Sequence, residues 1–112
     1  VVSLSWGSGG GSLAAQDIID FATAQGTLVV AAAGNGNTSL PFYPAAYNHV
    51  IAVANVTVGD LRYSGPSGSN YGGWLDVAAC GTSVKNIRKP TSETRWEKSF
   101  DNSAPRARCG TW

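Results

Sequence analysis

The sequence predicts an α/β fold with a mainly parallel sheet, built from a βαβ unit and further strands. A short β-branched apolar run opens the chain, and a segment with helical periodicity follows it. A second, continuous apolar run (TLVVAAA) then completes the unit. Because strand, helix and strand occur in that order, the two strands should be parallel and joined by a right-handed crossover.

The bulk composition indicates a folded domain without a nucleic-acid or membrane partner. Of the 112 residues, 43% are hydrophobic and 13% are charged, which argues against disorder. The net charge of +1 gives no sign of attraction to nucleic acid or acidic lipid. No apolar run reaches the roughly 18 residues that a membrane-spanning helix needs.

The first strand is expected over residues 1–5, and a glycine-rich loop should follow it. Ser12 is a good helix N-cap, and the predicted helix runs over residues 13–25. Gly26 lies where helices commonly end. The apolar stripe of this helix is predicted from the spacing of Ala14, Ile18 and Ala22, with Ala15 and Ile19 beside them.

Three further strands are predicted after the helix. They cover residues 27–33, 49–55 and 74–79, and loops rich in Gly, Ser, Asn and Pro separate them. The unbroken apolar character of residues 27–33 is typical of a strand that is covered on both faces.

Two loops leave the carboxyl ends of the first two strands, where open parallel sheets collect their functional groups. These loops hold Ser5, Trp6 and Gly7 on one side and Gly34 and Asn35 on the other. An Asn amide supplies uncharged N–H donors, which acyl transfer needs at its developing oxyanion. Taken alone, an Asn after Gly at the end of a strand is more often an ordinary turn residue that caps its own backbone.

The glycine-rich stretch of residues 7–12 has a competing interpretation as a dinucleotide-binding loop between strand and helix. Ser12 stands where that motif has Gly or Ala, and no acidic residue ends the second strand to bind a ribose. A nucleotide-binding α/β domain therefore stays an alternative with less support.

Several segments taken together resemble the subtilisin family of serine proteases. They are VVSLSWG at the start, LVVAAAGN at residues 28–35, YPAAY at 43–47, VIAV at 50–53 and LDVAACG at 75–81. The resemblance covers about 84 residues, and the order and spacing of the pieces make it specific. It implies a partial three-layer subtilisin-like fold.

The resemblance also implies a function, namely that of a serine endopeptidase that cleaves peptide bonds in proteins. Asn35 would be the oxyanion donor, and Ser5, Trp6 and Gly7 would form the backbone edge that binds substrate. Gly7 would lie at the rim of the pocket for the residue before the scissile bond, and its lining would be Ala32, Ala33 and Gly34. Trp6 is bulkier than the usual aliphatic residue and would narrow the site of a more distal substrate residue.

The triad itself is not expected within this chain. The single histidine, His49, lacks the family's His-Gly-Thr-His surroundings, and Ser83 is followed by Val84-Lys85 instead of Met-Ala. We therefore expect an internal piece of the catalytic domain that is inactive alone, missing other parts of that domain. A second alternative is a small non-enzymatic peptide-binding module that uses the edge of residues 5–7.

Charge marks a boundary after residue 84. Residues 1–84 carry one basic and four acidic side chains, whereas residues 85–112 carry seven basic and three acidic ones. The peptidase domain is accordingly assigned to residues 1–84. Residues 85–112 are predicted to be a divergent tail outside it, which a frameshift or another foreign end would explain. A natural charged tail is the alternative.

The remaining expectations concern the cysteines, cofactors and location. Cys80 replaces the proline of the family's turn, and with Cys109 it is expected to be a free thiol more readily than half of a bridge. No cofactor or metal site is predicted, although the family can bind calcium through backbone carbonyls. The resemblance implies a secreted or extracytoplasmic protein.

Overall fold

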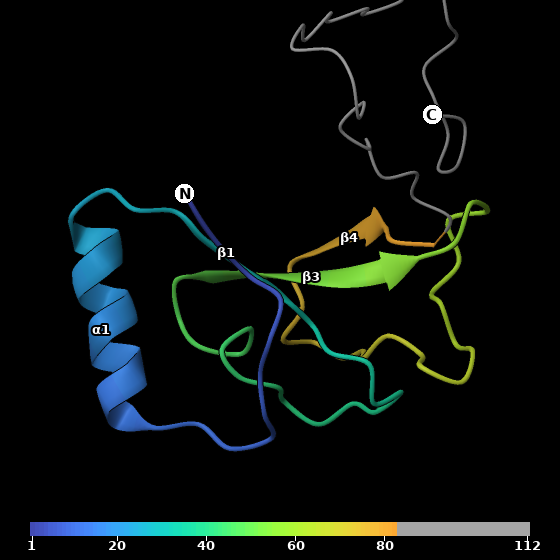
Figure 1. The fold of residues 1–112 in the computed structure, drawn as a ribbon, viewed down its shortest axis with the longest axis horizontal. Helices are drawn as coiled ribbons and strands as arrows, with labels where there is room; N and C mark the ends of the chain where they lie inside the picture. Colours follow the sequence, from blue (N-terminus) through green and yellow to red (C-terminus); the bar gives the residue numbers. More distant parts are fainter. Residues whose placement is uncertain (83–112) are drawn as a thin grey trace, which may run out of the picture.

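The computed structural model describes residues 1–82, and these form one parallel sheet with a helix packed on it (Figure 1). The tail of residues 85–112 and the neighbouring Ser83 lie outside the described residues. The elements in chain order are β1 (Val2–Leu4), α1 (Leu13–Ala24), β2 (Val29–Ala32), β3 (Val50–Val56) and β4 (Val77–Cys80). The predicted α/β fold with a parallel sheet is confirmed.

The sheet follows the sequence order β1-β2-β3-β4, and each neighbouring pair is parallel. Leu4 pairs with Ala31, and Ala31 pairs with Ala52. Because β1 and β2 end side by side, the loops that leave them start at the same edge of the sheet. The fold therefore brings residues 5–7 and 34–35 into one region.

Helix α1 begins and ends where the sequence indicates. The Oγ of Ser12 accepts a hydrogen bond from the Ala15 N–H (3.1 Å), and Gly26 adopts a positive φ of 82° just past the helix. The Tyr47 hydroxyl accepts a further bond from the Ser12 N–H (2.6 Å) and ties the helix start to the loop before β3.

The apolar stripe of α1 is rotated from the predicted one. Ile19 is the buried residue of the helix, whereas Ile18 is 69% exposed and Ala14 is exposed as well. Ile19 packs into the core with Val29, Ala31 and the neighbouring strand β3. The prediction that Ala14 and Ile18 form the packed stripe is therefore wrong, because the helix contacts the sheet through the row beside them.

Burial alternates along the two central strands. On the side of α1 the buried residues are Val29, Ala31, Val50, Ala52 and Ala54. Residues on the opposite face are half-buried, as at Val30, Ile51 and Val53, or exposed, as at Ala32. Within residues 1–82 only one face of the sheet is thus fully covered, in contrast to the expected burial on both faces.

Strand β4 starts three residues later than predicted, yet Asp76 already joins the sheet. The Asp76 N–H donates to the Ala52 carbonyl (3.1 Å), and its carboxylate accepts from the Ala52 N–H (2.8 Å). Cys80, the last residue of β4, is disulfide-bonded, so the preference for a free thiol at this position is wrong.

Candidate active site

Asn35 lies in the turn directly after β2, with its side chain exposed. Gly34 before it has a positive φ of 92°, a conformation that other residues adopt only with strain. Within the described part of the chain, no hydrogen bond holds the Asn35 amide. Its two N–H donors are therefore available to a ligand.

Asn70 holds this turn from the inside of the protein. Its side chain is 2% exposed, and Nδ2 donates to the Ala33 carbonyl (2.8 Å) while Oδ1 accepts from the Gly36 N–H (2.8 Å). Oδ1 also lies 3.4 Å from the Thr38 nitrogen, and the Asn70 backbone N–H donates to the Gly34 carbonyl (3.0 Å). A buried amide that is satisfied on both sides fixes the backbone on either side of Asn35.

Further polar contacts support Asn70. The Ser69 hydroxyl, 1% exposed, accepts from the Asn55 N–H (2.9 Å) and so anchors the segment to β3. The Arg62 guanidinium donates to the Ser69 carbonyl (2.9 Å) and to the Asn37 side chain (2.6 Å). The turn that presents Asn35 is thus fastened to residues of the long connection between β3 and β4.

The loop after β1 is fastened to the segment before β3. Ser8 and Tyr43 exchange two backbone hydrogen bonds of 2.8 Å each, which form an antiparallel bridge. Gly7 lies so close to the Tyr43 carbonyl oxygen and to Phe42 that a Cβ there would overlap both. Gly7 is needed for this close approach of two segments of the chain.

The Phe42 ring lies between the two loops that leave β1 and β2. Its edge is 2.5 Å from an ideal Cβ at Gly7 and 2.8 Å from an ideal Cβ at Gly34. Gly7 and Gly34 therefore both lie against the same edge of this aromatic ring. These are the two glycines that the family resemblance predicts at the pocket for the residue before the scissile bond.

The other predicted site residues occupy different surroundings. Ser5 and Ala32 share an open hollow at the ends of β3 and β4, on the sheet face away from α1. Ala33 is 1% exposed and presents its carbonyl to Asn70. Gly34, the third predicted lining residue, lies within contact distance of Phe42.

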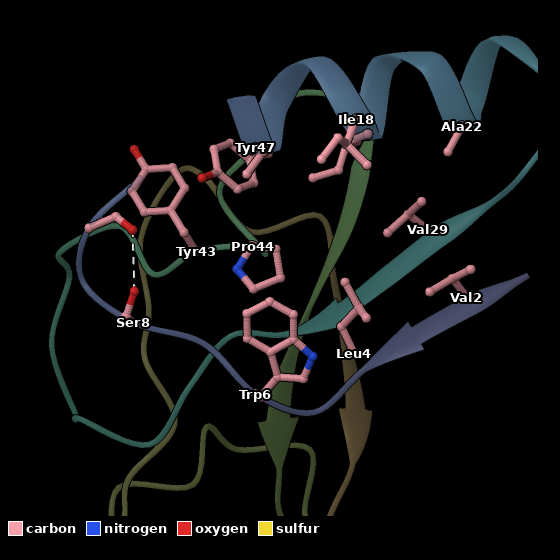
Figure 2. A pocket seen from close by; sticks show the side chains of 13 residues that line it. Val2, Leu4, Trp6, Ser8, Ile18, Ala22, Val29, Tyr43, Pro44 and Tyr47 are labelled. Carbon is pink, nitrogen blue, oxygen red and sulfur yellow. Dashed lines mark hydrogen bonds between the residues drawn. The ribbon is translucent and has the colours of Figure 1, made fainter. Parts of the chain in front are cut away.

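Trp6 turns away from this region and lines an apolar cavity of about 400 Å³ between β1 and α1. Figure 2 shows the indole near Pro44 and Leu4, with Ile18 and Ala22 of the helix on the other side. The indole is 67% exposed, so it borders this cavity without filling it.

His49 stands at the opposite end of the sheet. It precedes β3 and pairs through Nδ1 with the Asp20 carboxylate (3.0 Å), and both side chains are largely open to solvent. Residues 1–82 contain no group of three His, Cys, Asp or Glu side chains able to hold a metal ion. Nor does any helix in this range have the length and apolar character to cross a membrane.

The chain matches the model of the family described as "Subtilase family" over residues 1–109. It is 43% identical over 92 residues to thermitase of Thermoactinomyces vulgaris, a match that covers 82% of this chain and 32% of thermitase. It is 40% identical over 84 residues to the thermophilic serine proteinase of Bacillus sp. (strain AK1), which covers 75% of this chain and 20% of that protein.

A solved structure agrees with these sequence matches. The subtilisin-like protease Apa1 of Pseudoalteromonas sp. AS-11 superposes with a TM-score of 0.64 at 28% identity, over 69% of this chain and 17% of Apa1. The chain thus spans about a third or less of the length of the relatives that it matches.

The close approach at Gly7 predicts that adding one methyl group at this position lowers the stability of the fold. Gly7→Ala should lower the free energy of unfolding by about 1–3 kcal/mol, because the new Cβ overlaps the Tyr43 carbonyl and the Phe42 ring. Gly9→Ala is the matched control, since a Cβ at Gly9 meets nothing within 4 Å. Denaturant unfolding of the full-length protein measures both, and equal stability of the two variants would contradict the assignment.

Proposed function

The chain belongs to the subtilase family, and on that premise we propose that it forms part of a serine endopeptidase that hydrolyses peptide bonds in proteins through an acyl-enzyme. The single observation that carries this proposal is Asn35, an exposed amide whose flanking backbone is fixed by a buried one. The substrate is a protein or peptide, and the site of action is outside the cytoplasm, as the family resemblance implies.

The role of Asn35 is to donate from Nδ2 to the oxygen of the tetrahedral intermediate. An oxyanion donor is effective when it is already oriented before the charge develops, because no reorganisation is then needed during the reaction. The hydrogen bonds from Asn70 to Ala33 and Gly36 supply that orientation at the level of the backbone. The Asn35 amide carries no charge, so it brings no counter-ion into the site, and its N–H groups remain available to the developing oxyanion.

The substrate backbone binds along the segment of residues 5–7 that continues β1. In the described part of the chain β1 has no strand on its outer side, so an extended peptide can add there as a further strand. Trp6 would then meet a substrate residue farther from the scissile bond, because its side chain points toward the cavity beside α1.

Phe42 adds a preference to this scheme. Because its ring fills the space between Gly7 and Gly34, the pocket for the residue before the scissile bond is shallow. We therefore assign the enzyme a preference for small side chains at that substrate position.

The nucleophile and its base are assigned to parts of the protein beyond residues 1–82. His49 is unsuited because it lies before the amino end of β3, level with the start of β2, while Asn35 follows the carboxyl end of β2. The four residues of β2 alone separate the two positions by roughly 13 Å. A base at that distance cannot reach a reaction centre beside Asn35.

Removing the Asn35 amide tests the proposed role directly. In the full-length protein, Asn35→Ala should lower kcat by roughly 10²–10³-fold with little change in KM, a magnitude taken from the corresponding donor of subtilisin, a member of the same family. Asn48→Ala is the control, because the hydrogen bonds of Asn48 come from its backbone. An unchanged kcat in Asn35→Ala, measured on a peptide ester or anilide, would exclude the role.

Shortening Phe42 should widen the pocket. In Phe42→Ala, kcat/KM for a peptide with Phe before the scissile bond should rise at least about tenfold relative to the peptide with Ala there, since one or two accommodated methylenes are worth that much. Phe21→Ala, on the exposed side of α1, is the control and should leave the ratio unchanged. A ratio that does not move in Phe42→Ala would show that Phe42 does not line the pocket.

The isolated 112-residue chain should be inactive and poorly folded. It offers no positioned Ser–His pair within residues 1–82, and Val30, Ile51 and Val53 leave one apolar sheet face incompletely covered. We expect no labelling by a fluorophosphonate probe, strong binding of an apolar dye and no sharp melt. Stoichiometric labelling, or a cooperative transition of a monomer, would overturn this expectation.

A further inference from the structure

Asn35 is followed by Gly36, and this is the only Asn-Gly pair in the sequence. In such a pair the nitrogen of the following residue can attack the side-chain amide carbon, because glycine has no Cβ to obstruct the approach and its backbone is unusually free. The pair lies in an exposed turn at the end of a strand, and the Asn35 side chain has no hydrogen bond to the described part of the chain. The electrophilic carbon is therefore accessible.

The attacking atom, in contrast, is restrained. The Gly36 N–H donates to Oδ1 of Asn70 (2.8 Å), and Asn70 is buried and held by the Ala33 carbonyl at its other end. Attack requires this nitrogen to lose its proton and turn toward Cγ of Asn35. The hydrogen bond to Asn70 opposes both changes, since it keeps the proton in place and fixes the plane of the peptide.

We propose that Asn35 is a latent deamidation site whose reaction is suppressed by Asn70. In the step itself, hydroxide or water removes the proton from the Gly36 nitrogen, which then bonds to Cγ of Asn35. Nδ2 leaves as ammonia after taking up a proton, and a five-membered succinimide joins residues 35 and 36. Water opens that ring at either carbonyl and gives aspartate or isoaspartate at position 35.

The neighbouring asparagines supply an internal comparison. Asn37 belongs to the same turn and is exposed, but the β-branched Thr38 follows it. Asn48 is exposed as well and precedes His49. Both are accessible to water yet have a following side chain that hinders attack, so accessibility alone does not select Asn35.

The consequence for activity rests on the proposed function. Deamidation replaces two N–H donors by a carboxylate, which only accepts hydrogen bonds and is negatively charged. Such a group repels an oxyanion instead of stabilising it. The deamidated fraction would therefore be inactive. The hydrogen bond between the Gly36 N–H and Asn70 would then determine the rate at which the enzyme loses activity.

The test measures deamidation itself and needs no activity. The full-length protein, as wild type and as Asn70→Ala, is incubated in mildly alkaline buffer, and the fractions of aspartate and isoaspartate at Asn35 and Asn37 are followed by peptide mapping. Deamidation of Asn35 should accelerate about five- to tenfold in Asn70→Ala, the factor by which loss of one buried hydrogen bond raises the population of the released turn. Asn37 should stay much slower than Asn35 in both proteins, because the β-branched Thr38 hinders attack even where the Thr38 nitrogen has lost its contact with Asn70.

Two further variants separate release of the turn from general loss of stability. Ser69→Ala removes an equally buried side chain that bonds to Asn55 and to the Asn70 carbonyl but leaves the Asn70 side chain on the turn, so Asn35 should deamidate much more slowly than in Asn70→Ala. Adding Gly36→Ala to Asn70→Ala should suppress the reaction, because the new methyl group hinders attack. The nearest atom to that methyl group, Oδ1 of Asn70 at 3.1 Å, is absent in this background.

Equal rates in wild type and Asn70→Ala, or an equal acceleration in Ser69→Ala, would overturn the proposal. If Asn70→Ala does not fold, hydrogen exchange of the wild type decides: the Gly36 amide should be protected beside the exposed Asn35, and unprotected exchange would overturn it. Deamidation of Asn35 without loss of kcat would instead count against the oxyanion role of Asn35 and leave the Asn70 assignment intact.

Discussion

The buried side-chain amide of Asn70 is the contact on which the candidate site depends. It joins the Ala33 carbonyl to the Gly36 N–H across the turn that presents Asn35. An unpaired amide at this depth would cost the protein about 1–3 kcal/mol, so the turn and Asn70 fix each other. The result is an exposed amide mounted on a rigid backbone, which is the arrangement that the proposed electrostatic stabilisation of a transition state requires.

Close packing of backbone against side chain shapes the rest of the site. Gly7 and Gly34 both lie against the Phe42 ring, and the Ser8–Tyr43 bridge holds the loop after β1 beside the segment that carries this ring. The parallel register of β1 and β2 brings these loops to one edge. The proposed substrate preference would therefore be coupled to stability, because the ring that we propose limits the pocket also packs against both loops.

The sequence predicted the elements well because their signals are local. Ser12, Gly26 and the apolar runs mark boundaries that the structure places within about three residues. The rotation of α1 was missed because its alanines are spread around the helix and give little contrast between Ile18 and Ile19. Asn70 and Phe42 could not be found, since their contacts join segments far apart along the chain. A lone Asn in a Gly/Ser-rich loop carries no sign that it will be buried.

The central claim is that the Asn35 amide donates to the tetrahedral oxygen while Asn70 holds the turn. A crystal structure of the full-length protein with a peptide aldehyde bound as a tetrahedral adduct tests it most directly. The account predicts Nδ2 of Asn35 about 2.7–3.1 Å from the adduct oxygen, with the bonds from Asn70 to Ala33 and Gly36 unchanged. An adduct oxygen that is bound by other donors, with Asn35 turned toward solvent, would contradict it.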